Sequence, residues 1–132
     1  MKALAILASA LIISGCSTPV TQSQVQNANF SEKPTDTEAF ELIKSYLQNT
    51  LIDPNSLILK CSPVTGKGWA RYYMTDKPTF GYLVLCSVNA KNKLGGYTGQ
   101  TPYMYVINGR RISDFEFNPQ AWAKGELYDV IK

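Results

Sequence analysis

Two apolar segments separated by a polar, glycine-rich stretch dominate the pattern of hydrophobic and polar positions. The first, Phe80–Val88, is apolar on both of its alternating faces, as is typical of a strand at the centre of a sheet. The second, Tyr103–Ile107, is rich in aromatic and β-branched residues, which favour extended backbone. We therefore expect both segments to be central strands of one small sheet.

Three shorter segments are expected to complete this sheet. Leu57–Cys61 and Trp69–Met74 have the composition of strands and are bounded by turn residues. Asn108-Gly109 is a strong hairpin signal, so Arg110–Ser113 should return beside the preceding strand as an edge strand. The pattern predicts a mainly antiparallel sheet of about five strands.

A long amphipathic stretch precedes the strands. Thr35 and Glu38 have the spacing of a capping box, apolar residues then recur at helical spacing, and Asp53-Pro54 closes the stretch. We predict a helix over Asp36–Leu51 whose apolar side packs on the sheet.

Near the other end of the chain, Asn118-Pro119 resembles an N-cap followed by proline at the first helical position. It predicts a short C-terminal helix carrying Trp122, and the pattern after Gly125 is ambiguous. Residues 35–132 are therefore expected to form a single α+β domain, a size that suits one compact unit.

The N-terminus has the features of a lipoprotein signal peptide. Met1–Lys2 supply positive charge, and Ala3–Ile13 form an apolar segment shorter than the roughly 20 residues that span a bilayer. Ile13-Ser14-Gly15-Cys16 match a bacterial lipobox, which predicts removal of residues 1–15 and attachment of diacylglycerol and palmitate to Cys16. The alternative is an ordinary secretory signal that contains a cysteine.

Residues 16–34 are rich in Ser, Thr, Gln and Asn and have no hydrophobic period. This composition predicts a flexible tether between lipid and domain, in which Phe30 is the only large apolar residue available to dock on the domain. Ser17, rather than aspartate, follows the lipidated cysteine. For a Gram-negative source this favours the outer membrane, with the domain facing the periplasm.

The two remaining cysteines, Cys61 and Cys86, each lie in a predicted strand. The envelope outside the cytoplasm is oxidising, so we predict a disulfide between them, the alternative being two buried free thiols. The chain has no histidine, which removes the commonest acid/base and transition-metal ligand. We therefore expect neither a bound metal nor a cofactor.

The stretch that joins the two central strands, residues 88–99, is longer than a simple hairpin loop. Its glycines imply left-handed backbone angles or a close approach by another chain, and Asn89 and Asn92 are able to hydrogen-bond their own backbone. It resembles a block in small, uncharacterised bacterial and phage-associated lipoproteins. The shared residues are Cys86, Val88–Asn92, Gly95–Gly99 and, upstream, Asp53–Ser56.

In that group glycine more often follows the cysteine, where this chain has Ser87, and the resemblance implies no activity. Two interpretations of the stretch remain open. In the first, which we favour, the loop satisfies its own hydrogen bonds, sets strand register and packs Tyr97 on the sheet. In the second it is a recognition loop, with Tyr97 as its anchor and Lys91 and Lys93 as its charges.

Charge is distributed in blocks. The sheet region is basic and the segments on both sides of it are acidic; its basic residues are Lys60, Lys67, Arg71, Lys77, Lys91, Lys93, Arg110 and Arg111. The favoured explanation is a solvated surface neutralised by the flanks. The alternative is a basic face toward anionic lipid, lipopolysaccharide or cell-wall polymer. The oxidising compartment argues against a nucleic-acid partner.

No catalytic constellation is recognisable, and Asp114 and Glu116 on either side of Phe115 are more typical of a solvated edge than of a carboxylate pair. We therefore expect a protein that is not an enzyme. The favoured function is a membrane-anchored lipoprotein that acts as a binding or accessory module for an envelope protein. The first alternative is a structural subunit of a secretion or pilus apparatus. The second is an inhibitor of a wall-degrading enzyme, based on a faint similarity of Trp122–Gly125 to lysozyme-inhibitor lipoproteins.

Overall fold

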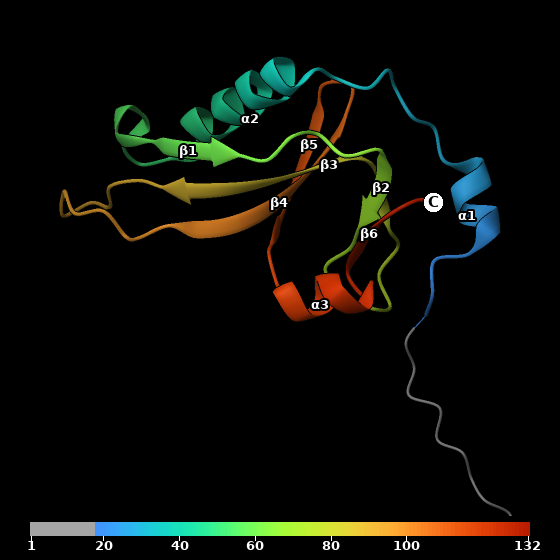
Figure 1. Cartoon of the computed structure of the whole chain (residues 1–132). Coiled ribbons are helices and arrows are strands. Elements are labelled where there is room, and N and C mark those ends of the chain that lie inside the picture. The colour runs from blue at the N-terminus through green and yellow to red at the C-terminus, as the bar shows by residue number, and fades with distance from the viewer. Residues whose placement is uncertain (1–17) are drawn as a thin grey trace, which may run out of the picture.

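The computed structural model describes residues 18–132 as an open antiparallel sheet with helices on both of its faces (Figure 1). It confirms the predicted α+β class. The sheet has six strands in the order β5-β4-β3-β2-β6, with β1 also paired to β3. The strands are β1 (Ile58–Cys61), β2 (Lys67–Ala70), β3 (Thr79–Asn89), β4 (Thr101–Asn108), β5 (Arg111–Glu116) and β6 (Tyr128–Val130). The helices are α1 (Gln22–Asn27), α2 (Asp36–Thr50) and α3 (Pro119–Lys124), with a 3-10 turn at Pro54–Ser56.

The central position of β3 follows from its length and composition. Its 11 residues pair with β4 on one side, while β1 and β2 share the other side at its two ends. Cys61 lies opposite Cys86 in the β1–β3 register, and Lys67 lies opposite Tyr82 in the β2–β3 register. Because both faces of β3 are covered, its side chains are apolar on both, as the sequence predicts.

Helix α2 covers one face of the sheet. The Thr35 hydroxyl accepts a hydrogen bond from the Glu38 backbone and the Glu38 carboxylate accepts one from the Thr35 backbone, which confirms the predicted capping box. The buried residues of the resulting core are Ala39, Ile43, Leu47, Val64, Tyr82, Val84, Cys86, Val88, Tyr105 and Ile107.

A second, smaller core lies on the opposite face, beneath α3. It contains Ala70, Leu83, Met104, Val106, Phe115, Ala121 and Tyr128. The Asn118 side chain accepts hydrogen bonds from the backbone of Gln120 and Ala121, which confirms the predicted N-cap. The chain after Gly125, ambiguous in sequence, returns as β6 and adds an edge to the sheet.

All the predicted strands differ at one or both ends from the observed ones, and two of these differences have structural reasons. The segment expected at Trp69–Met74 is β2 at Lys67–Ala70, where Gly68 fits because a Cβ there would lie only 2.9 Å from the Asp129 carbonyl oxygen. Arg71, the residue after the strand, is buried. The hairpin turn after β4 is Gly109-Arg110 rather than Asn108-Gly109, with Gly109 at a φ of 64°.

The expectation of a flexible tether over residues 16–34 is wrong for the part that the structure describes. Gln22–Asn27 form α1, which begins with a capping box between Thr21 and Gln24. Phe30 then docks on the domain, with its ring centroid 6.0 Å from that of Phe80 and 6.1 Å from that of Tyr82. The docking of Phe30 agrees with the sequence analysis. Composition did not predict the helix or the order of the segment, because hydrogen bonds from distant side chains to its backbone help to hold it.

Candidate functional site

The loop between β3 and β4 lies at the end of the sheet far from the first described residues (Figure 1). Within it, Lys91 and Tyr97 form an antiparallel bridge, and the Asn92 N–H donates to the Gly96 carbonyl at 2.9 Å. The Asn92 side-chain oxygen accepts from the Leu94 and Gly96 backbone at 2.9 and 3.3 Å. The tip therefore has its own hydrogen-bond network, as the sequence predicts for Asn92.

The base of the loop is tied to the rest of the domain. The Lys91 N–H donates to the Ser56 hydroxyl at 2.8 Å, and that hydroxyl donates to the Asp53 carbonyl at 2.8 Å. The Gly99 N–H donates to the Asn89 side-chain oxygen at 3.2 Å. These bonds hold both ends of the loop in a fixed relation to the sheet.

Two glycines of the loop have left-handed backbone angles, with φ of 79° at Gly95 and 98° at Gly99. Gly96 is not in this region, and a Cβ at any of the three would meet nothing within 4 Å. Left-handed geometry, the first of the two predicted reasons for these glycines, therefore holds at Gly95 and Gly99.

The side chains of the loop face solvent. Leu94 at the tip is 94% exposed and Tyr97 is 47% exposed. The Lys91 ammonium lies 5.5 Å from the centroid of the Tyr97 ring, a cation–π geometry. The structure thus brings Lys91 and Tyr97 together and leaves Lys93 exposed beside them. The favoured prediction that Tyr97 packs on the sheet is wrong. Tyr97 pairs with Lys91 beyond the ends of β3 and β4, where its ring lies outside the core.

The predicted disulfide between Cys61 and Cys86 is confirmed. The two residues are direct cross-strand partners of β1 and β3, with Cα atoms 4.0 Å apart. Cys86 is 1% exposed and belongs to the core under α2. The bond fixes β1 to β3 three positions before the loop begins to leave the sheet at Asn89.

The predicted lipidation residue, Cys16, lies outside the described residues. The first described residue, Thr18, is held by the domain, because its carbonyl accepts a hydrogen bond of 2.6 Å from the Arg71 guanidinium. Among residues 18–132, no helix is long and apolar enough to cross a membrane.

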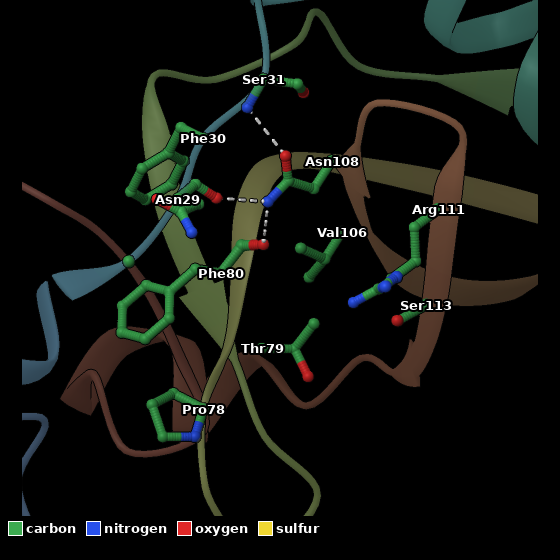
Figure 2. Close-up of a pocket in the computed structure, with 11 residues that line it drawn as sticks. Asn29, Phe30, Ser31, Pro78, Thr79, Phe80, Val106, Asn108, Arg111 and Ser113 are labelled. Carbon is green, nitrogen blue, oxygen red and sulfur yellow. Dashed lines mark hydrogen bonds between the residues drawn. The ribbon is translucent and has the colours of Figure 1, made fainter.

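A pocket of about 720 Å³ lies between the N-terminal segment and the sheet (Figure 2). Figure 2 shows Asn108 at its edge, where its side chain accepts from the Ser31 backbone at 2.8 Å and donates to the carbonyls of Asn29 and Phe80 at 2.7 and 3.2 Å. The guanidinium of Arg111 points into the pocket between Val106 and Thr79. The side-chain amide of Asn108 already binds the backbone of the N-terminal segment, so it is not available to orient a ligand. We therefore assign this pocket a structural role.

The carboxylate Asp114, considered in sequence with Glu116, also has a structural partner. Its Oδ1 accepts a hydrogen bond of 2.7 Å from the Tyr46 hydroxyl of α2, and this bond raises the pKa of Tyr46 to about 12. Glu116 is exposed. Within residues 18–132 there is no group of three or more His, Cys, Asp or Glu residues placed to hold a metal ion.

Sequence reasoning missed Asn108 and Arg71 as anchors of the N-terminal segment. Their partners lie more than 50 positions away in the chain, so no local pattern could have found them. Comparisons of the chain with protein-family models, with curated proteins and with solved structures found no match. The resemblance of the loop to lipoprotein sequences therefore stays a prediction.

Proposed function

We propose that the protein is a lipid-anchored lipoprotein of the bacterial envelope that presents the loop between β3 and β4 to an envelope protein. One observation carries the binding part of this proposal: Leu94, which is almost fully exposed, lies in a hydrogen-bonded loop. Figure 1 shows that loop at the end of the domain far from the first described residues. A lipid at Cys16, close to Thr18 in the chain, leaves that end free to meet a partner.

The internal hydrogen bonds of the loop favour binding because they lower the entropy lost on association. A segment that is already ordered loses less conformational entropy on binding than a flexible one. Asn92 organises the tip, and Ser56 and Asn89 organise the base. The loop is therefore prepared to act as a rigid projection.

The side chains of the loop suit a concave, acidic-rimmed surface on the partner. Leu94 provides an apolar contact that protrudes, and Tyr97 adds an amphipathic ring of the kind that often contributes strongly to interfaces. Lys91 and Lys93 add positive charge beside the tip, which favours acidic residues around the receiving pocket.

Metabolic labelling with a palmitate analogue tests the anchor. The wild-type chain should be labelled, and Cys16→Ala should remove the label while Cys61→Ala/Cys86→Ala should keep it. Labelling of the Cys16→Ala variant would contradict the proposed anchor and with it the argument for location.

Site-specific photo-crosslinking in intact cells tests the loop. A photoreactive amino acid in place of Leu94 should give one defined adduct with an envelope protein, whereas the same group in place of the exposed Thr37 of α2 should not. The Leu94 adduct should disappear when Lys93→Ala and Tyr97→Ala are added. Absence of an adduct would contradict the binding role, and an adduct with a second copy of this chain would favour a structural subunit instead.

A further inference from the structure

The turn between β2 and β3 and helix α3 both carry exposed aromatic and basic side chains. We call these side chains the anchor-side surface: Tyr72, Tyr73, Lys77, Trp122 and Lys124. Tyr72 is 60% exposed, Tyr73 71% and Trp122 36%. The core packing described above uses only part of each ring, since Tyr72 contacts Phe115 and Trp122 contacts Tyr128.

The two elements that carry this surface meet at one cleft. Its volume is about 760 Å³, and its lining includes Tyr72 and Tyr73 from the turn and Asn118, Pro119 and Gln120 from the start of α3. Figure 1 shows helix α3 below the sheet, with the turn after β2 running between it and the first blue residues.

Arg71 fixes the start of the described chain to this same region. Its guanidinium donates to the Thr18 carbonyl at 2.6 Å and to the Glu126 carbonyl at 2.8 and 3.0 Å, and the side chain is only 4% exposed. Its backbone N–H donates to the Leu127 carbonyl at 2.8 Å. Thr18 is therefore attached both to the residue before Tyr72 and to the segment after α3.

Chain geometry then places any lipid on Cys16 close to this surface. Cys16 precedes Thr18 by two positions, and two extended residues span at most about 7 Å. A lipid attached to Cys16 enters the bilayer at the headgroup level, so the domain end that holds Thr18 lies against the headgroups.

The chemistry of the surface matches a membrane interface. Tyrosine and tryptophan concentrate where the hydrocarbon meets the headgroups, because each has an apolar body and a polar edge. Lysines at that level interact with anionic headgroups. Asp76 and Glu116 also lie in this region, so the aromatic rings rather than net charge provide the attraction.

We infer that the anchor-side surface rests on the phospholipid bilayer and fixes the orientation of the domain, with the loop between β3 and β4 directed away from the membrane. This inference rests on the lipid anchor of the proposed function. Beyond the anchor itself, the domain contacts the bilayer through a defined face. A long flexible tether would instead let the domain rotate freely above the membrane.

Tryptophan fluorescence of the full lipidated protein tests the inference. The chain has two tryptophans, Trp69 and Trp122, and Trp69 is buried at 7% exposure. In vesicles of phosphatidylethanolamine and phosphatidylglycerol, the Trp69→Phe variant should show blue-shifted Trp122 emission that lipids with brominated acyl chains quench. The matched control, Leu94→Trp with both native tryptophans replaced by phenylalanine, should be neither shifted nor quenched.

A second reporter covers the case in which Trp69→Phe does not fold. Tyr73→Trp in a Trp122→Phe background keeps the buried Trp69 and should gain quenchable emission on vesicles. If the palmitate label is present at Cys16 but neither reporter is quenched, or if the Leu94→Trp reporter is quenched equally, the inference is overturned while the anchor stands. If the label itself is missing, it is the proposed function that fails.

Discussion

The backbone N–H of Lys91 donates to the hydroxyl of Ser56 at 2.8 Å, although the two residues are 35 positions apart. Ser56 belongs to the upstream block Asp53–Ser56, and Lys91 belongs to the block Val88–Asn92, which the resemblance to lipoprotein sequences couples. The Asn89 side chain in turn holds Gly99 of the third block, Gly95–Gly99. Residues from all three blocks thus meet at the base of one loop.

Replacing Ser56 with alanine should destabilise the domain. The hydroxyl is in a buried residue, 8% exposed, and its loss leaves the Lys91 N–H without its partner. We expect a decrease of about 1–3 kcal/mol in the free energy of unfolding, measured by urea denaturation. Ser45→Ala on the exposed side of α2 is the control and should change stability by less than about 0.5 kcal/mol. Equal effects of the two substitutions would contradict the role of Ser56.

The bond between Cys61 and Cys86 should contribute a large part of the stability of so small a domain. It closes a segment of 25 residues, for which chain entropy predicts about 3.5 kcal/mol. Reduced wild-type protein and the variant Cys61→Ala/Cys86→Ala should both lose about this amount, and alkylation of the oxidised protein without reductant should leave its intact mass unchanged. Two alkylated cysteines in protein purified from the periplasm would show that the bond does not form there.

Local signals in the sequence account for most of the fold. The capping box at Thr35, the N-cap at Asn118 and the cysteine pair each depend on neighbours in the chain or on a choice between few partners, and the structure confirms all three. The edge strand β6 and the anchors Asn108 and Arg71 depend on partners far away in sequence. No periodicity records such contacts.

The candidate loop was recognisable from sequence only in part. Its asparagines and glycines have local roles, so their geometry could be predicted. The exposure of Tyr97 could not be predicted, because it depends on where β3 and β4 end. An aromatic residue beside a strand is ordinarily packed on the sheet.

Gly95 and Gly96 offer a matched pair of substitutions. Gly95 has a φ of 79°, so alanine there should cost about 1 kcal/mol in the free energy of unfolding. Gly96 is outside the left-handed region and has open space around it, so alanine should be neutral or should stabilise by up to about 1 kcal/mol. Equal losses at both positions would show that the backbone of the tip differs from the one described here.

The raised pKa of Tyr46 leads us to expect a loss of stability at alkaline pH. Its hydrogen bond to Asp114 raises its pKa from 10.0 to about 12 in the folded protein. Between these values the unfolded chain has lost the phenolic proton and the folded chain retains it, so the contribution is complete below pH 10 and disappears as the pH rises through 12. Urea denaturation from pH 9 to 11.5 should therefore show a steeper decline for the wild type than for Tyr46→Phe. Parallel declines would contradict the assignment.

Alanine substitutions at Tyr97 and Tyr105 compare an exposed tyrosine ring with a buried one. Tyr105 is 1% exposed in the core beneath α2, whereas Tyr97 is 47% exposed and contacts Lys91. Tyr105→Ala should therefore cost about 3–5 kcal/mol in the free energy of unfolding, as other buried aromatic residues do. Tyr97→Ala should cost about 1 kcal/mol, because only about half of the surface of this side chain leaves water on folding.

The same substitution then distinguishes the two interpretations of the loop. If the loop is a recognition element, Tyr97→Ala leaves the urea midpoint near that of the wild type and greatly reduces the crosslink from a photoreactive group at position 94. If the loop serves only to set strand register, Tyr97→Ala leaves any crosslink intact. A loss of several kcal/mol in the free energy of unfolding on Tyr97→Ala would contradict the exposed position of the ring. It would show that Tyr97 is packed in the core, because a half-exposed side chain makes too few contacts for a loss of that size.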